Sequence, residues 1–114
     1  FRAAESIIIP CTGKEYVEEA ILSAQFAAEN SSHVQEILIV TDQIIAENKI
    51  SDKTGKIRSI YFDPTPYTPD THAYGNIYRS RICKIYAPRY ASHNRILLID
   101  ADLMLLQEPL LMIL

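Results

Sequence analysis

One segment in the last fifth of the sequence limits what this chain can fold into. Residues 96–99 form an unbroken apolar run that follows Arg95 and ends at Asp100. A short apolar run without alternation is typical of a strand covered by helices on both faces, as in a parallel sheet. We therefore expect an α/β fold in which this run is a strand buried on both faces.

Three further segments are expected to be strands, each ending at a proline or an acid. Residues 6–10 are β-branched and stop at a proline, residues 36–42 end in Asp42, and residues 57–62 precede Asp63 and Pro64. Residues 14–30 have apolar side chains at helical spacing. This alternation predicts right-handed crossovers that build a Rossmann-like, mostly parallel sheet with flanking helices.

The other segments have weaker signals. We expect a short helix over residues 43–49, a helix over residues 77–87 that Pro88 terminates, and another helix opening at Pro109. Residues 64–76 are rich in proline, threonine and tyrosine, which predicts an irregular loop. Its aromatic and hydroxyl groups suit contact with a base or a sugar, and a plain surface connection is the alternative.

The length fits one domain spanning residues 1–114, or part of one. Because the sequence starts at Phe1 and stops on an apolar run without a helix cap, we expect the domain to be incomplete at its C-terminal end. No apolar stretch approaches the roughly 20 residues of a transmembrane segment, and nothing resembles a signal peptide, so a cytoplasmic location is expected.

The net charge limits the kinds of partner that we expect, and the cysteine content indicates the redox compartment. A net charge of −3 argues against broad binding to nucleic acid or to an anionic membrane. A small basic cluster stands out against this background: Arg79, Arg81, Lys84 and Arg89. Cys11 and Cys83 have no metal-type spacing, and we expect both to be buried thiols in a reducing compartment.

The apolar run of residues 96–99 leads into the motif Asp100-Ala101-Asp102. In an extended segment, side chains two residues apart point to the same side, so both carboxylates are expected to face one cleft. Two neighbouring carboxylates favour a hard cation such as Mg²⁺ or Mn²⁺, which completes its shell with water and phosphate oxygens. The alternative is a pair of solvated carboxylates that cap a turn.

Two stretches of the sequence resemble a known group of enzymes. Residues 76–88, followed by residues 95–102, are similar to the arginine-bearing helix and the "LDAD" strand of family 8 glycosyltransferases. The opening, from Ile9-Pro10 into the helix, is closer to family 2. The chain thus resembles the nucleotide-sugar-binding part of a GT-A fold glycosyltransferase with a DxD motif, although family 8 enzymes usually carry an acid where this chain has Gly13-Lys14.

The resemblance implies transfer of a sugar from a nucleotide-diphosphate sugar, most often a UDP-sugar, to an acceptor hydroxyl, with Mn²⁺ or Mg²⁺ as cofactor. It implies that Asp102 is the main metal ligand and that Asp100 contacts the metal or the donor ribose. The other implied donor contacts are Pro10, Cys11, Thr12, Asp42, Ala101 and Arg81, with Arg79 as second choice to Arg81. The resemblance assigns no catalytic residue within the chain.

Two other functions remain open. A haloacid-dehalogenase-like phosphatase also places Asp-x-Asp after an apolar strand, with Asp100 as nucleophile and Asp102 as acid and base. A non-catalytic binding or assembly module is the third possibility, with solvated carboxylates and residues 109–114 as the partner surface.

Overall fold

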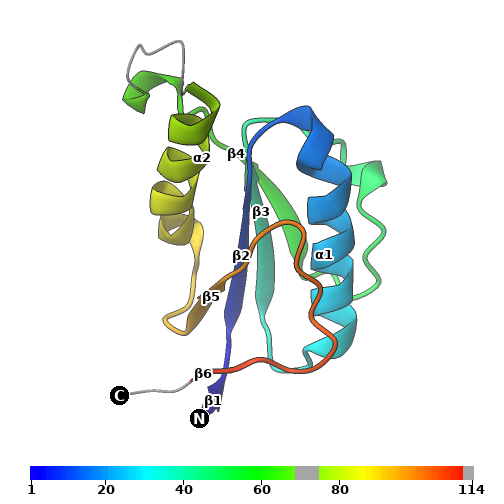
Figure 1. Cartoon of the computed structure of the whole chain (residues 1–114). Coiled ribbons are helices and arrows are strands. Elements are labelled where there is room, and N and C mark those ends of the chain that lie inside the picture. The colour runs from blue at the N-terminus through cyan, green and yellow to red at the C-terminus, as the bar shows by residue number, and fades with distance from the viewer. Residues whose placement is uncertain (69–74, 112–114) are drawn as a thin grey trace.

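The computed structural model of the chain describes residues 1–68 and 75–111. Its main sheet has four parallel strands in the order β4-β3-β2-β5 (Figure 1). They are β2 (Ser6–Cys11), β3 (Glu36–Thr41), β4 (Ile57–Tyr61) and β5 (Ile96–Leu98). The expected α/β fold with a parallel sheet is confirmed, and the arrangement is compatible with a Rossmann-like fold.

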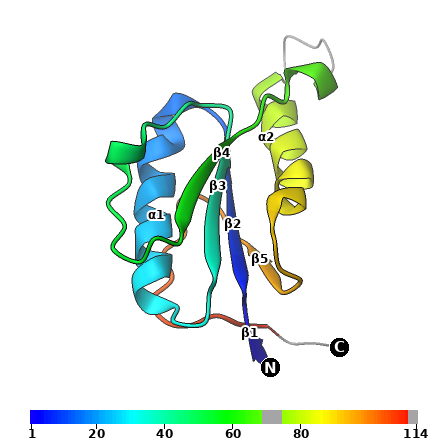
Figure 2. The same cartoon turned by 180° about the vertical axis from the view of Figure 1, so that it is seen from behind.

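The two helices cover opposite faces of this sheet (Figures 1 and 2). The 3₁₀ turn η1 (Lys14–Tyr16) leads into α1 (Val17–Asn30), as expected for residues 14–30, and α2 (Gly75–Tyr86) lies on the other face. Ile7 and Ile9 of β2 pack in the core on the α1 side, whereas Ile8 packs with Cys83 of α2. Because both faces of β2 and β3 are covered, both strands are apolar without alternation.

β5 does not have the burial on both faces that its apolar sequence predicted. It has only three residues and lies at one edge of the four-stranded sheet, where it pairs with residues 6–8 of β2 alone. Ile96 and Leu97 are half-buried, and Leu98 is 42% exposed. The prediction that this run is buried on both faces is therefore wrong, because an edge strand is flanked by the sheet on one side only.

β2 continues past the proline that was expected to stop it. Pro10 pairs in register with Val40, and Cys11 with Thr41. The Ile8 carbonyl accepts a hydrogen bond from Ile99 N–H on the β5 side, and Pro10, two residues later, faces the same side. Since β5 has ended there, the missing N–H of Pro10 leaves no gap in the hydrogen-bond ladder.

Several short segments also differ from the sequence-based expectation. The helix expected over residues 43–49 is reduced to the 3₁₀ turn η2 (Glu47–Lys49), and the expected irregular loop contains another, η3 (Thr65–Tyr67). Residues 69–74 of that loop lie outside the described residues. α2 begins at Gly75, and the 3₁₀ turn η4 (Ala87–Tyr90) carries the chain on past Pro88, which sits in its first turn where no N–H is needed.

After the acidic motif the chain runs as a strap, residues 103–111, beside α1 on the same face of the sheet (Figure 1). Asn30 Nδ2 donates to the Leu105 carbonyl at 3.1 Å, and Ser23 Oγ donates to the Leu103 carbonyl. The strap ends in β6 (Leu110–Leu111), which pairs antiparallel with β1 (Arg2–Ala3). The helix expected from Pro109 is therefore wrong for residues 110 and 111, which form strand pairs instead.

Within residues 1–68 and 75–111, no helix has both the length and the apolar content needed to cross a membrane.

Candidate functional site

An open cavity of about 820 Å³ lies at the carboxyl ends of β2, β3 and β5. All residues that the family resemblance implied for donor or metal binding line it: Pro10, Cys11, Thr12, Asp42, Arg79, Arg81, Asp100, Ala101 and Asp102. The described aromatic and hydroxyl residues of the loop 64–76, Thr65, Tyr67 and Thr68, do not line it. The fold brings them together because the carboxyl ends of parallel strands share one edge of the sheet. Lining residues not assigned a role from the sequence include Gly13, Glu15, Tyr16, Glu19, Asn76, Ile77, Ser80 and Lys84.

The acidic motif lies in a turn. Leu103 N–H donates to the Asp100 carbonyl at 3.1 Å, which closes residues 100–103 into one turn. The prediction that Asp100 and Asp102 project from an extended strand is therefore wrong, because β5 ends at Leu98 and the ladder ends with the bond from Ile99 N–H. Both carboxylates line the cavity all the same, and the Asp100 side chain is 67% exposed.

Lys84 is the basic group of α2 that pairs with this turn. Its Nζ lies 3.5 Å from Asp100 Oδ1. The sequence indicated Lys84 only as a member of the basic cluster. Its position three residues after Arg81 could have indicated that Lys84 also lines the cavity, because residues at this spacing lie on one face of a helix.

Asp42 is the most enclosed carboxylate of the cavity, with a side chain only 8% exposed. It accepts hydrogen bonds from Gly13 N–H at 2.9 Å, from Arg79 Nη2 at 3.0 Å and from Gln43 Nε2 at 3.1 Å. Burial by itself would raise the pKa of Asp42, but these hydrogen bonds and the Arg79 charge outweigh it and hold the pKa below its usual value. Asp42 is therefore a fixed anion that ties the exits of β2 and β3 to α2.

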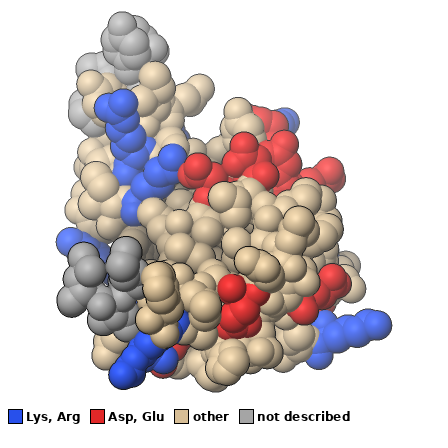
Figure 3. Space-filling model, turned by 60° about the horizontal axis from the view of Figure 1, so that its bottom comes forward, with Lys and Arg blue, Asp and Glu red and all other residues tan. Residues whose placement is uncertain are grey.

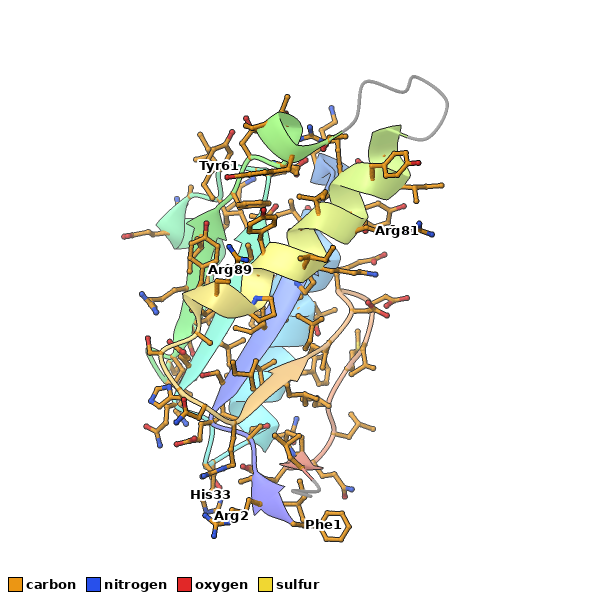
Figure 4. All side chains as sticks on the ribbon, turned by 90° about the vertical axis from the view of Figure 1, so that its left-hand side faces the viewer. Phe1, Arg2, His33, Tyr61, Arg81 and Arg89 are labelled. Carbon is orange, nitrogen blue, oxygen red and sulfur yellow. The ribbon has the colours of Figure 1, made fainter. Side chains whose placement is uncertain are left out.

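The two candidate arginines have different roles. Arg79 is held by Asp42, by Thr65 Oγ1 at 2.8 Å and, more distantly, by Asp63 at 3.9 Å. Arg81 is exposed and extends from α2 toward the side on which the chain leaves β5 (Figure 4). This geometry fits the sequence-based preference for Arg81 over Arg79 as the residue that faces a ligand.

Acidic and basic side chains occupy different sides of the molecule at this end (Figure 3). The basic lining residues come from α2, and the acidic ones come from η1 and the start of α1, from the end of β3 and from the turn after β5. Gly13 has a φ of 92°, and a Cβ built there would lie 2.9 Å from Glu15 Oε1. Glu15 thus brings a carboxylate back over Gly13, although its sequence position indicated only a solvated helix face.

The carboxylates that line the cavity suit a cation whose remaining ligands are substrate oxygens. In the part of the chain that the structure describes, no three His, Cys, Asp or Glu side chains are grouped in a way that would hold a metal ion. A pair of carboxylates is nevertheless what Mg²⁺ usually takes from a protein, with water and phosphate oxygens as its remaining ligands. Asp100 and Asp102, which line one cavity, supply side chains of the kind that such an ion takes.

Both cysteines are buried, as expected from the sequence. Cys11 is 4% exposed and Cys83 is 1% exposed, and Cys83 Sγ donates to the Val40 carbonyl at 3.3 Å. Burial raises the pKa of each thiol to about 11. Cys11 therefore contributes shape to the cavity and carries no charge at neutral pH.

No protein-family model matches the chain, and no match to it is found among curated proteins or solved structures.

Proposed function

We propose that the chain binds a nucleotide-diphosphate sugar, most often a UDP-sugar, in this cavity and belongs to a metal-dependent glycosyltransferase of the GT-A type. One observation carries the proposal. Residues from four distant parts of the sequence line a single cavity at the carboxyl edge of a parallel sheet: residues 10–12, Asp42, residues 79–81 with Lys84, and residues 100–102.

The position of the cavity supports a nucleotide ligand. From β2 the chain builds outward through β3 to β4, and then crosses to the other side of β2 to form β5. Open α/β sheets bind ligands outside the carboxyl ends of the strands, at the point where the strand order reverses in this way. β2 and β5 flank that point here, and residues 10–13 and 100–102 follow them directly.

The size and charge of the cavity support a ligand that is both anionic and metal-associated. Its volume of about 820 Å³ falls within the roughly 300–1,000 Å³ that small-molecule sites usually have. The α2 wall offers Arg81 and Lys84 to phosphate oxygens, and the opposite turn offers two carboxylates to a cation. A diphosphate bridged by a divalent cation matches both walls.

The chemical roles follow from where charge develops. A divalent cation at Asp100 and Asp102 would act as a Lewis acid on the diphosphate leaving group. Arg81 and Lys84 add positive charge on the same side, where the leaving group becomes more anionic as the glycosidic bond breaks. Asp42, fixed by Gly13 and Arg79, lines the cavity and supplies an acceptor for a donor group of the ribose or base.

Thermal unfolding of the chain with Mn²⁺, with UDP and with both tests the proposal. We expect a joint stabilisation, about 2.7 kcal/mol at a hundredfold excess of ligand over its dissociation constant. The joint shift should disappear in Asp102→Asn and persist in Glu47→Gln, which removes an exposed carboxylate outside the cavity lining.

Two other results would contradict the proposal in different ways. Beryllofluoride binding at Asp100 without any nucleotide would favour the phosphatase alternative. No response to UDP, GDP or CMP with Mn²⁺, together with self-association that is lost in Leu110→Ser, would favour the assembly module.

A further inference from the structure

An ion pair crosses the cavity from α2 to the acidic turn. Lys84 Nζ lies 3.5 Å from Asp100 Oδ1, and the two side chains are 47% and 67% exposed. Among the residues that the structure describes, Asp102 forms no such pair with a lysine or arginine. Of the two carboxylates of the motif, one is thus neutralised by the protein's own cation.

Lys84 competes with a metal ion for Asp100, because its Nζ lies 3.5 Å from Asp100 Oδ1. An ammonium and a divalent cation on the same carboxylate repel each other, so a metal ion at Asp100 weakens the hold of Lys84 on it. The lysine head is a point charge on a flexible stem with three donors, and it changes partners easily. Arg79 contrasts with it, because Asp42 and Thr65 hold its guanidinium on two sides.

A new partner for the displaced ammonium would lie within the same cavity. Lys84 and Arg81 are one turn apart on α2, on the same face, and both line the cavity. A diphosphate bound to a metal at the acidic turn would bring anionic oxygens between that turn and α2. The ammonium can therefore leave the carboxylate for the diphosphate without leaving the cavity.

We propose, on the basis of the proposed function, that Lys84 is a positioning residue that exchanges partners. It holds Asp100 in the free protein, is displaced when a divalent cation binds, and then pairs with the diphosphate. Binding of metal and nucleotide is thereby coupled through Lys84, in addition to the direct bridge between metal and phosphate. Such coupling is reciprocal, so each ligand raises the affinity for the other by the same factor.

Calorimetric titrations of UDP with and without Mn²⁺, and of Mn²⁺ alone, test this exchange in the wild type, Lys84→Met and Lys49→Met. Lys84→Met should bind Mn²⁺ alone more tightly, because the competing cation is gone. It should bind UDP at least about fivefold more weakly when Mn²⁺ is present, a change within the usual range of coupling factors. Without Mn²⁺ its UDP affinity should stay near that of the wild type, because Lys84 is then bound to Asp100. Lys49→Met, an exposed lysine outside the cavity lining, should match the wild type throughout.

Asp100→Asn provides a second arm without metal. It releases Lys84, so UDP alone should bind more tightly than in the wild type. In the double variant Lys84→Met with Asp100→Asn this gain should vanish. A gain that persists in the double variant would come from the lost negative charge and would overturn the exchange.

The failures of the two proposals are distinguishable. A wild type that binds no UDP with Mn²⁺ would overturn the proposed function and this inference together. A wild type that binds both, with a Lys84→Met variant that weakens UDP equally with and without Mn²⁺, would make Lys84 a static contact. That result would overturn the exchange and leave the donor site in place.

Discussion

Arg79 Nη2 lies 3.0 Å from Asp42 Oδ2, and this ion pair fastens α2 to the end of β3. The Asp42 side chain is 8% exposed and that of Arg79 is 29% exposed, so the pair is partly shielded from water. Asp42 also accepts the Gly13 N–H, which connects the same anion to the exit of β2. One carboxylate therefore sets the relative positions of three cavity walls.

Arg79→Met should destabilise the fold, because it leaves the enclosed Asp42 carboxylate without its cation. We expect a loss of about 1–2 kcal/mol in the free energy of unfolding, measured by urea denaturation at neutral pH. Arg81→Met is the matched control, since Arg81 is exposed on the same helix, and it should change stability by less than about 0.5 kcal/mol. Equal losses in both variants would mean that helix propensity or stem packing, rather than the Asp42 pair, is responsible.

Glu36 plays a corresponding part at the opposite end of the sheet. It is 6% exposed and accepts hydrogen bonds from Ser6 Oγ at 2.8 Å, from Arg58 Nη2 at 3.1 Å and from Ser92 N–H. Burial would raise the pKa of Glu36, but the hydrogen bonds prevail and lower it. The carboxylate thus joins β2, β3, β4 and the loop that leads to β5.

A lowered pKa in the folded state means that Glu36 stabilises the fold above its unfolded-state pKa of about 4.3. This contribution is lost as the pH falls through the folded-state pKa. Glu36→Gln should therefore lower the free energy of unfolding by about 2 kcal/mol at neutral pH. The difference from wild type should shrink as the pH falls below the unfolded-state pKa of about 4.3. Urea unfolding over an acid pH series measures it, with Glu29→Gln on the exposed face of α1 as control. A difference that stays constant with pH would show that the charge of Glu36 contributes nothing.

Gly13→Ala should be costly, and Gly75→Ala should not. Gly13 has a φ of 92°, which side chains rarely adopt, and its Cβ would meet the Glu15 carboxylate at 2.9 Å. Gly75 begins α2 with nothing within 4 Å of an added Cβ. We expect thermal unfolding to show a loss of about 1–2 kcal/mol at Gly13 and no loss at Gly75. If both alanines are neutral, the turn after β2 adapts without strain.

Both thiols should react slowly in the folded protein. Burial raises the pKa of Cys11 and of Cys83 to about 11, and thiolate is the reactive form. Labelling with a chromogenic disulfide at mildly alkaline pH should be slow for the native chain and rapid in urea. Rapid labelling of the native Cys83→Ser variant would show that Cys11 is open to the cavity and would contradict its burial.

The parts of the fold that the sequence predicted well are those whose burial follows from local pattern. β2, β3 and α1 have helices or sheet on every apolar side, so their runs and helical spacing reflect the three-dimensional environment directly. The edge position of β5 and the strand β6 were not predicted correctly, because they depend on where other strands end and on the distant partner β1. A sequence pattern does not contain that information.

The candidate site divides in the same way. Asp42 and the motif residues Asp100 and Asp102 follow strand ends, and parallel strands end at one edge, so their meeting was predictable. Lys84 and Glu15 lie on helices, and their relation to the cavity depends on how each helix is rotated and on how Glu15 folds back over Gly13. Their functions stay proposals, as do those of the predicted residues.

The pairings within the sheet also imply an order of assembly. Ser6 is in register with Glu36 and also with Ile96, so the β2–β5 pairing joins residues three times farther apart in the chain than the β2–β3 pairing does. Closing a longer loop costs more entropy before any contact forms, and distant strand pairings slow folding. The edge that presents Asp100 and Asp102 is therefore expected to dock after β2 and β3 have paired, and to open before they separate.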